Sequence, residues 1–165
     1  MNKALFLDRD GVINVDYGHV HEVKRFHFID GIFELCKLFQ KNQFLIIIIT
    51  NQAGIGKGKY TEQDFLNLNE WMINQFRLNG IVISKTYYCP HTPEENCLCR
   101  KPNPGMFLEA IKEFDIDTDK SVLIGDKESD ILAGKKAGIK VNILFNIDSH
   151  KQIIESLKNL IKIEV

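Results

Sequence analysis

Short apolar runs alternate with amphipathic stretches along this chain, and this alternation constrains its fold more than any other feature. The runs span residues 4–8, 44–50, 83–89, 120–125 and 141–145. The second run contains Phe44-Leu45-Ile46-Ile47-Ile48-Ile49 without polar alternation, which is typical of a strand covered on both faces in a parallel sheet. Repeated strands and helices of this kind predict an α/β fold with a doubly wound parallel sheet.

The amphipathic stretches between these runs are predicted to be helices that cover the sheet. One set of apolar residues at helical spacing is Phe65, Leu68, Met72 and Phe76. Thr61 is the expected N-cap of that helix, with Asp64 at its third position. Pro104 is expected to be the first residue of a later helix, and residues 152–161 are expected to form the last one.

Size and charge exclude several classes of protein. A length of 165 residues predicts one domain over residues 1–165. A net charge of −1 gives no electrostatic reason to expect nucleic acid or a membrane as partner. The apolar segment 44–49 is too short to span a bilayer, and the N-terminus runs directly into the first expected strand, which leaves no room for a signal peptide. We therefore expect a cytoplasmic monomer.

Two aspartates stand at alternate positions where the first apolar run ends, in Leu7-Asp8-Arg9-Asp10-Gly11. Functional side chains of open α/β sheets gather at the carboxyl ends of strands. Two carboxylates held close together repel, so a bound cation, a shared proton or solvent must offset their charge. With a divalent cation, one carboxylate can act as nucleophile and the other as proton carrier. The alternative is an Asp-rich turn after an edge strand.

Polar residues also follow the second and fourth runs. Thr50, Asn51 and Gln52 precede the glycine-rich segment 53–58, and such a strand end suits phosphate oxygens, although the segment lacks the P-loop pattern. Asp126 is expected on the same rim as the first aspartates if the strands are neighbours, which would give an oxygen-rich site suited to Mg²⁺. Asp130 either supports this site or is an acidic residue favoured at a helix N-terminus.

A third group combines cysteine and histidine. Cys89, His91, Cys97 and Cys99 offer three thiolates and an imidazole, which is a full tetrahedral set for Zn²⁺. Because no ligand position stays open, we interpret this zinc as structural; the alternative is two unrelated pairs of thiols. Arg100-Lys101 follows directly, so a metal-clamped loop would present both cations rigidly, whereas an isolated pair of this kind is usually solvated surface.

The combined motifs resemble those of a known superfamily. Asp8-x-Asp10-Gly11, Thr50-Asn51, Lys101 and Gly125-Asp126-x₃-Asp130 resemble, over about residues 3–145, the four motifs of the haloacid dehalogenase (HAD) superfamily of phosphatases, in the right order. The cysteine–histidine loop is similar to that of two related groups, the D-glycero-D-manno-heptose 1,7-bisphosphate 7-phosphatases and the histidinol-phosphate phosphatases. The strings 8–20, 50–58 and 100–106 favour the heptose group. Ala53 and Lys57 depart from it, since that family often has serine and arginine there.

The resemblance implies an aspartyl-phosphate mechanism. Asp8 would be the nucleophile and Asp10 the general acid and base, while Thr50, Asn51 and Lys101 would stabilise the transferring group. Catalytic Mg²⁺ would be bound by the side chains of Asp8 and Asp126 and by the backbone carbonyl of Asp10. The positions that match substrate contacts of the heptose family are Arg9, Asp16, Tyr17, Gly18, His19, Asn51, Gln52, Ala53, Arg100 and Lys127.

We therefore expect an enzyme that removes the 7-phosphate of a small phosphorylated sugar, D-glycero-D-manno-heptose 1,7-bisphosphate, in the synthesis of nucleotide-activated heptose for lipopolysaccharide or other surface glycans. Arg100 is the expected contact for the distal phosphate, and the loops 14–29 and 89–103 replace a large cap domain. The alternatives are a histidinol-phosphate phosphatase, a receiver domain, which needs no zinc loop, and an inactive zinc-stabilised binding module, against which the intact Asp8, Asp10, Lys101 and Asp126 argue.

Overall fold

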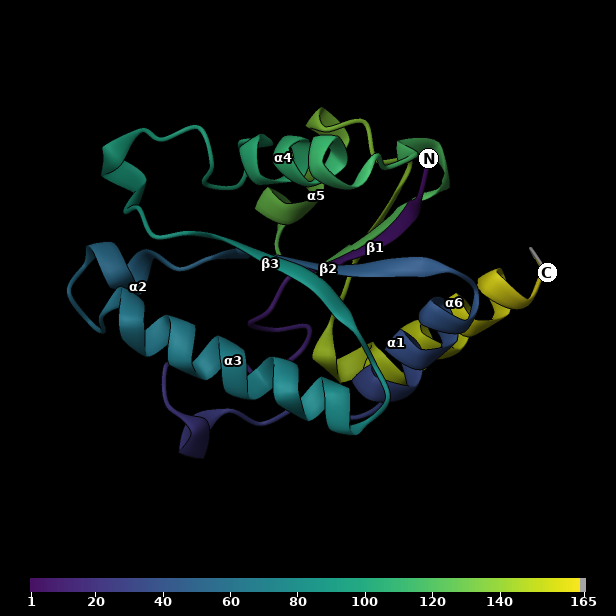
Figure 1. Ribbon diagram of the computed structural model, residues 1–165, viewed down its shortest axis with the longest axis horizontal. Coiled ribbons are helices and arrows are strands. Elements are labelled where there is room, and N and C mark those ends of the chain that lie inside the picture. The colour runs from purple at the N-terminus through teal and green to yellow at the C-terminus, as the bar shows by residue number, and fades with distance from the viewer. Residues whose placement is uncertain (164–165) are drawn as a thin grey trace.

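A five-stranded parallel sheet lies between two layers of helices in residues 1–163, the part of the chain that the computed structural model describes (Figure 1). The strand order is β3-β2-β1-β4-β5. The strands are β1 (Lys3–Leu7), β2 (Phe44–Asn51), β3 (Ile83–Cys89), β4 (Val122–Gly125) and β5 (Val141–Leu144). All five predicted strands are confirmed, with bounds within two residues of those expected.

Helices cover both faces of the sheet, as the doubly wound prediction requires. The helices are α1 (Ile32–Lys41), α2 (Ala53–Gly56), α3 (Glu62–Leu78), α4 (Gly105–Phe114), α5 (Glu128–Lys136) and α6 (His150–Ile163). Figure 1 shows α4 and α5 on one face and α1, α3 and α6 on the other. Among the described residues, no helix is long and apolar enough to cross a membrane.

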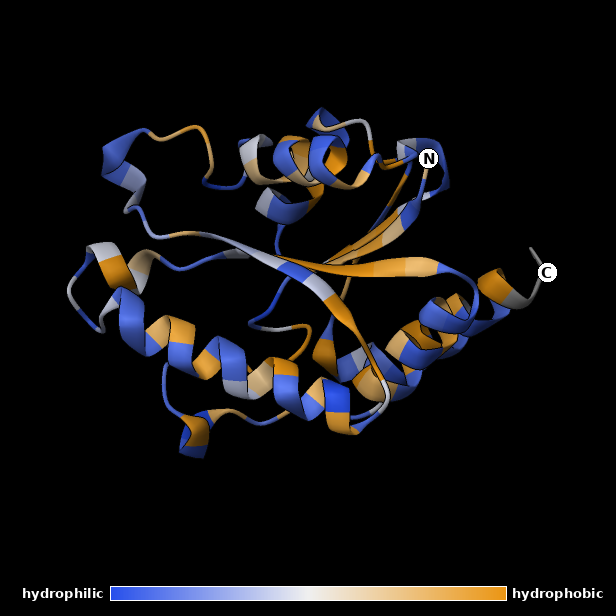
Figure 2. Cartoon of the chain, viewed as in Figure 1, coloured by the Kyte–Doolittle hydropathy of each residue, from blue (hydrophilic) through white to orange (hydrophobic). Residues whose placement is uncertain are grey.

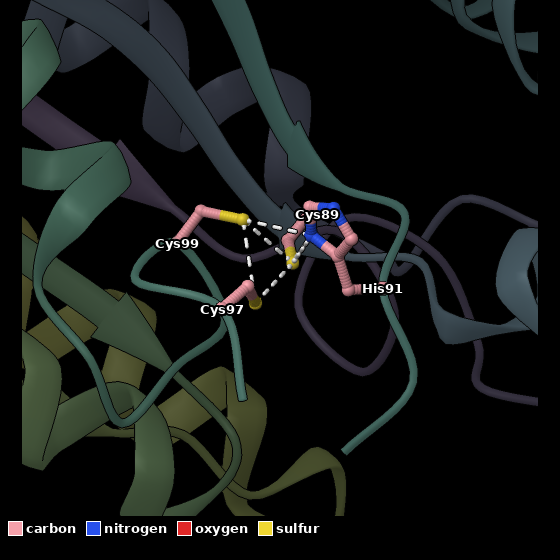
Figure 3. A group of neighbouring side chains, drawn as sticks. All are labelled: Cys89, His91, Cys97 and Cys99. Carbon is pink, nitrogen blue, oxygen red and sulfur yellow. Dashed lines mark hydrogen bonds between the residues drawn. The ribbon is translucent and has the colours of Figure 1, made fainter. Parts of the chain in front are cut away.

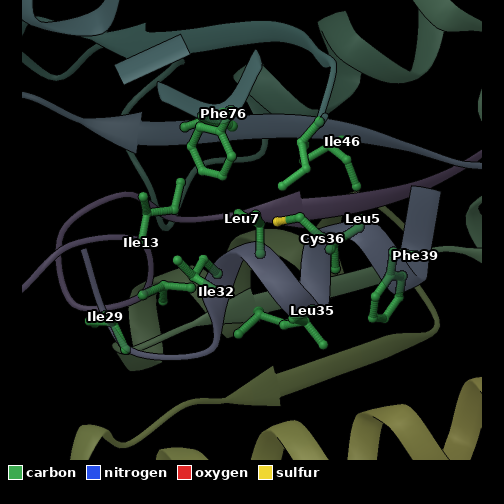
Figure 4. Packing of buried hydrophobic residues seen from close by; sticks show 14 of the residues in the cluster. Leu5, Leu7, Ile13, Ile29, Ile32, Leu35, Cys36, Phe39, Ile46 and Phe76 are labelled. Carbon is green, nitrogen blue, oxygen red and sulfur yellow. The ribbon is translucent and has the colours of Figure 1, made fainter. Parts of the chain in front are cut away.

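The uninterrupted apolar runs are explained by two hydrophobic clusters, one on each face of the sheet. Leu5 and Ile46 belong to the cluster that includes buried residues of α1 and α3, whereas Phe6 and Ile47 belong to the cluster that includes residues of α4. Figure 2 shows the resulting apolar strands between helices with mixed surfaces, and Figure 4 shows side chains of β1, β2 and α1 packed in the first cluster. Alternate residues of one strand therefore serve opposite cores.

Local signals in the sequence match most of the helix boundaries. Thr61 caps α3, since its hydroxyl accepts a hydrogen bond from the Asp64 amide at 3.0 Å and its own amide donates to the Asp64 carboxylate at 2.9 Å. Helix α4 begins one residue later than predicted, because Pro104 is its N-cap and Gly105 its first residue. Cys36 is a fully buried core thiol of α1, and burial raises its pKa to about 12.

The parallel order brings the ends of three motif-bearing strands together. Strand β1 pairs with β2 on one side and with β4 on the other, so their carboxyl ends share one edge. The amide of Asp8 continues the pairing, donating to the carbonyl of Ile124 at 3.1 Å. The connections after β1 and β3 leave from this edge, and they carry residues 8–31 and 90–104.

Candidate active site

Three carboxylates converge at this edge of the sheet. Asp8 follows β1, Asp126 follows β4, and Asp130 lies in the first turn of α5; one oxygen from each lies within 4.8 Å of the others. Oδ1 of Asp126 is buried and has no hydrogen-bond partner among residues 1–163. Gly11 makes room for this side chain, because its φ is +90° and a Cβ there would lie 2.1 Å from Oδ2 of Asp126.

A buried lysine joins two of these carboxylates. Nζ of Lys101 lies 2.9 Å from Oδ1 of Asp8 and 2.6 Å from Oδ1 of Asp130, and it donates to the carbonyl of Ile49 at 2.8 Å. Asn51 clamps the lysine backbone, accepting from its amide at 3.1 Å and donating to its carbonyl at 3.2 Å. Lys101, only 3% exposed, is therefore held in one position beside Asp8.

Burial and like charge disfavour the ionised forms of these clustered carboxylates. Burial raises the pKa of Asp8 well above its usual value; Lys101 opposes this shift, while Asp130 and Asp126 add to it. Burial also raises the pKa of Asp126. For Lys101, the two carboxylates outweigh burial and raise the pKa, so the ammonium stays charged. Three carboxylates with one lysine and an unpartnered buried oxygen fit a hard divalent cation such as Mg²⁺.

Asp10 lies in a different environment from these three. Its Oδ1 accepts hydrogen bonds from Arg9 at 2.9 Å and from Asn14 at 3.0 Å, and its Oδ2 accepts one from Gln52 at 3.2 Å. Its carboxylate is not part of the group that could hold a metal through side chains. Two aspartates that are neighbours in the motif thus have separate surroundings, which suits separate roles.

A cavity of about 280 Å³ opens over Asp8 and Asp10. Of the positions predicted to contact substrate, those that line it are Asp16, Gly18, His19, Asn51, Gln52, Ala53, Arg100 and Lys127. Lys101 lines it too, and four residues outside the predicted contact set complete the wall: Lys57, Tyr60, Ser129 and Asp130. Lys57 and Asp130 were singled out in the sequence. Ser129 is an unspecified position inside the fourth motif, and Tyr60 lies outside every motif, so only the fold identifies these two as wall residues.

Besides Asp126, three other predicted active-site residues do not line the cavity. Arg9 is 1% exposed, and its guanidinium donates to Asp10 and, at 2.7 Å, to the carbonyl of Val20. The hydroxyl of Tyr17 is within 2.9 Å of His27 Nδ1, on an exposed part of the first loop. Thr50 is 1% exposed, and its hydroxyl accepts a hydrogen bond from Gln52 at 2.9 Å. Arg9 thus holds Asp10 and the first loop in place.

The four predicted zinc ligands come together in the loop after β3. Figure 3 shows the three sulfur atoms turned toward one another and toward the ring of His91. Their Sγ atoms are separated by 2.9 Å (Cys89 to Cys99), 3.5 Å (Cys89 to Cys97) and 3.6 Å (Cys97 to Cys99). Nδ1 of His91 lies 3.3 Å from Cys89 and 3.2 Å from Cys99. A tetrahedral site with Zn–S bonds of about 2.3 Å sets its sulfur atoms about 3.8 Å apart. The ligands would each have to move by less than about 1 Å to enclose the ion, so the donor set fits Zn²⁺.

This cysteine–histidine cluster is tied to the cavity on two sides. The amide of Arg100 donates to Sγ of Cys97 at 3.3 Å, so the cluster holds the backbone of a cavity residue. Gly56, at the end of α2, donates from its amide to the carbonyl of Pro90 at 2.9 Å, and a Cβ there would lie 2.8 Å from the same oxygen. The loop therefore packs directly on the segment that follows β2.

Comparisons with known proteins agree with this geometry. A sequence model described as HAD-hydrolase-like matches residues 98–151. The chain is 43% identical to D-glycero-beta-D-manno-heptose-1,7-bisphosphate 7-phosphatase of Pasteurella multocida, over 99% of this chain and 97% of that protein. It is 48% identical to D-glycero-alpha-D-manno-heptose-1,7-bisphosphate 7-phosphatase of Campylobacter jejuni, over 96% and 91%.

The fold has a solved counterpart. The crystal structure of D,D-heptose 1,7-bisphosphate phosphatase from B. bronchiseptica, complexed with magnesium and phosphate, is similar with a TM-score of 0.80. The alignment covers 93% of this chain and 99% of that one, at 22% identity. At this identity the likeness shows the fold, and the sequence relatives show the family.

Proposed function

The chain belongs to the heptose-1,7-bisphosphate 7-phosphatase family of the HAD superfamily, and from this premise we propose that it removes the 7-phosphate of D-glycero-manno-heptose 1,7-bisphosphate. One observation carries the proposal: the carboxylate of Asp8 stands on the cavity floor, 2.9 Å from a buried lysine and beside Asp126. This arrangement offers a nucleophile and a cation to one phosphoryl group. The named relatives act on heptose bisphosphate, so the histidinol-phosphate alternative is not favoured.

The chemistry follows in two displacements. A carboxylate oxygen of Asp8 attacks phosphorus while the bond between phosphorus and the sugar oxygen breaks, and the carboxyl of Asp10 gives its proton to that oxygen. Asp10 then takes a proton from water as the water oxygen attacks the aspartyl-phosphate, which releases inorganic phosphate and restores Asp8. Lys101 and Asn51 stabilise charge on the transferring group, and buried Thr50 supports the same strand end.

The two candidate metal sites have different proposed roles, one catalytic and one structural. We propose that Asp8, Asp126 and the backbone carbonyl of Asp10 hold Mg²⁺, while Asp130 keeps Lys101 in place. When bound there, the ion would offset the negative charge of the carboxylates and of the transferring phosphoryl group. Cys89, His91, Cys97 and Cys99 would hold a structural Zn²⁺, since four protein ligands leave no position for substrate.

Cations at the rim of the cavity fit a substrate with a second phosphate. Arg100, Lys57 and Lys127 line the wall, and Nη1 of Arg100 is buried without a hydrogen-bond partner in the described part of the chain. We propose that this guanidinium binds the distal phosphate, whose oxygens match its planar fork. The thiols of the zinc loop are not paired in disulfides, which suits the reducing cytoplasm, and we propose that the protein acts there. We also propose that it acts as a monomer.

A kinetic panel tests the proposal. Purified protein supplied with Mg²⁺ should turn over both anomers of the heptose 1,7-bisphosphate with a kcat/KM at least about 100-fold above that for histidinol phosphate, because only the bisphosphate fills both ends of the cavity. A preference for histidinol phosphate, or the absence of any turnover alongside a long-lived phosphoprotein, would overturn the assignment. Analysis of the product by ³¹P NMR distinguishes loss of the 7-phosphate from loss of the 1-phosphate.

A further inference from the structure

Tyr60, between α2 and α3, is bound in place by contacts from three segments. Its side chain is 6% exposed, and its hydroxyl donates a short hydrogen bond to Oε1 of Gln52. The ring packs on Gly54, where a Cβ would lie only 2.2 Å from it. On another side the ring stacks with His21 of the first loop, with centroids 4.9 Å apart and planes at 12°. The phenol is therefore held in one position at the cavity wall.

Gln52 passes this constraint on to the reacting groups. Because its Oε1 accepts from Tyr60, its Nε2 faces the other way and donates to Oδ2 of Asp10 at 3.2 Å and to the hydroxyl of Thr50 at 2.9 Å. A glutamine amide has two N–H donors, and both are used here. The backbone amide of Gln52 is used as well, donating to the carbonyl of Cys89 at 2.8 Å. All N–H donors of Gln52 therefore bond to other groups of the protein. If the side-chain amide were flipped, its oxygen would face the carboxylate of Asp10 and repel it.

We propose that Tyr60 is a positioning residue for the general acid Asp10 and that it acts through Gln52, an inference that rests on the phosphatase function proposed above. Arg9 and Asn14 hold one oxygen of the Asp10 carboxyl, and Gln52 holds the other. With Tyr60 in place, the carboxyl faces the sugar oxygen at which the phosphorus–oxygen bond breaks, and its proton passes to that oxygen. Without the hydroxyl, Oε1 of Gln52 is left buried and unpaired, and the amide can turn away.

The phenol is suited to a fixed role as donor. Burial raises the pKa of Tyr60 to about 12, and the nearby Asp10 also raises it while Arg9 lowers it. The hydroxyl therefore keeps its proton in neutral solution and donates to Gln52 throughout turnover. This assigns Gln52 a positioning role in place of the substrate contact that the family resemblance implies.

The Tyr60→Phe variant tests the proposal with two leaving groups. A sugar alkoxide needs a proton as it departs, whereas p-nitrophenolate does not, and kcat/KM reports only the steps up to the departure of the leaving group. With heptose 1,7-bisphosphate, kcat and kcat/KM should fall at least about 10-fold, with KM within about twofold of its original value. With p-nitrophenyl phosphate, kcat/KM should change less than about twofold.

A matched control exists in Tyr87. This tyrosine is also 6% exposed, and its hydroxyl donates to Glu113, outside the residues that line the cavity. Tyr87→Phe should leave kcat/KM for both substrates unchanged. Thermal melting of all variants separates loss of fold from loss of positioning.

A double-mutant cycle with Gln52→Ala decides whether Tyr60 acts through the amide. If it does, Gln52→Ala alone should show the same dependence on the leaving group, and adding Tyr60→Phe should lower kcat no further. Additive losses, equal losses on both substrates, a rise in KM alone or an unchanged kcat would each overturn the proposal. If Tyr60→Phe fails to fold, the same readouts on Gln52→Ala decide. Failure of the proposed function looks different, since the unmutated protein would then fail to turn over heptose 1,7-bisphosphate.

Discussion

The carboxylate cluster and the cysteine–histidine cluster lie on the same side of the molecule but are built in opposite ways. The first gathers Asp8, Asp126 and Asp130 from separate strand and helix ends, adds the cation of Lys101, and faces a cavity. The second takes four ligands from residues 89–99 and closes on itself. An open set of hard oxygen ligands suits a metal that meets substrate, and a closed set of soft ligands suits a metal that only shapes a loop.

Substitution of the nucleophile should have the largest effect, because it should abolish turnover while leaving the fold and the cysteine–histidine cluster intact. Asp8→Asn should lower kcat by at least about 10⁴-fold, because the amide forms no phosphoenzyme. Lys101 keeps Asp130 at 2.6 Å and the carbonyl of Ile49 at 2.8 Å, so the fold should survive. Burial already disfavours the charged form of Asp8 and raises its pKa, so the melting temperature in chelator should not fall. Steady-state kinetics and thermal melting check both parts.

The matched control for this change is Asp119→Asn, an exposed aspartate at the far end of β4. It should alter neither turnover nor melting. Turnover of Asp8→Asn within a few-fold of the original would contradict the covalent mechanism and leave the carboxylate cluster without its assigned role.

Treatment with a chelator should have the second-largest effect, and it should affect the two clusters differently. A brief EDTA treatment should lower turnover by about 10³-fold, and Mg²⁺ should restore it, because the carboxylate cluster is open to the cavity. About one zinc per chain should survive the same treatment, since four ligands enclose it. Activity assays paired with elemental analysis test both statements. Loss of zinc together with activity, restored only by zinc, would reverse the roles given to the two sites.

The contrast between the clusters also decides what the sequence could predict. The cysteine–histidine ligands are close in the chain, so their spacing alone indicated a metal site, and the structure brings all four together. Asp8 and Asp126 were expected to meet only if β1 and β4 were neighbours, and the strand order confirms that they are. The apolar runs likewise predicted the sheet and both helical layers, because alternate residues of each strand face separate cores.

What the sequence left open depends on contacts between distant segments. The role of Asp130 stayed undecided between two interpretations until its ion pair with Lys101 was seen, and its Oδ2 also accepts from the amides of Asp126 and Lys127. Tyr60 belongs to no sequence motif, yet it packs beside Gln52 and is in contact with three segments of the chain. No local sequence pattern predicts such contacts, because they depend on how the long loops pack against the sheet and against one another.

Loss of one thiolate should affect substrate binding more than chemistry. Cys97→Ser should release zinc and lower the melting temperature by about 5–10 °C, which corresponds to a loss of about 2–3 kcal/mol. The KM for the bisphosphate should rise about 10-fold, because Sγ of Cys97 holds the amide of Arg100 at 3.3 Å. The fall in kcat should be smaller, since Asn51 still clamps the backbone of Lys101.

Cys36→Ala provides the matched control for that change. It removes a buried core thiol from α1 and should lower the melting temperature while zinc content and KM stay the same. A zinc-free Cys97→Ser protein with an unchanged KM would show that the cysteine–histidine cluster does not shape the cavity.

The smallest expected effect concerns the residue that joins the two clusters. Arg100 follows the last cysteine and precedes the buried lysine, and its Nη1 is buried without a partner among the residues described. Arg100→Lys keeps the charge but loses the planar fork, so KM for the bisphosphate should rise about 3- to 10-fold with kcat nearly constant. A monophosphate that lacks the distal group should show no change in KM, and that difference between substrates is the measurement that matters. An equal rise for both substrates would place Arg100 at the reacting phosphate, and the cation for the distal phosphate would then have to be sought at Lys57 or Lys127.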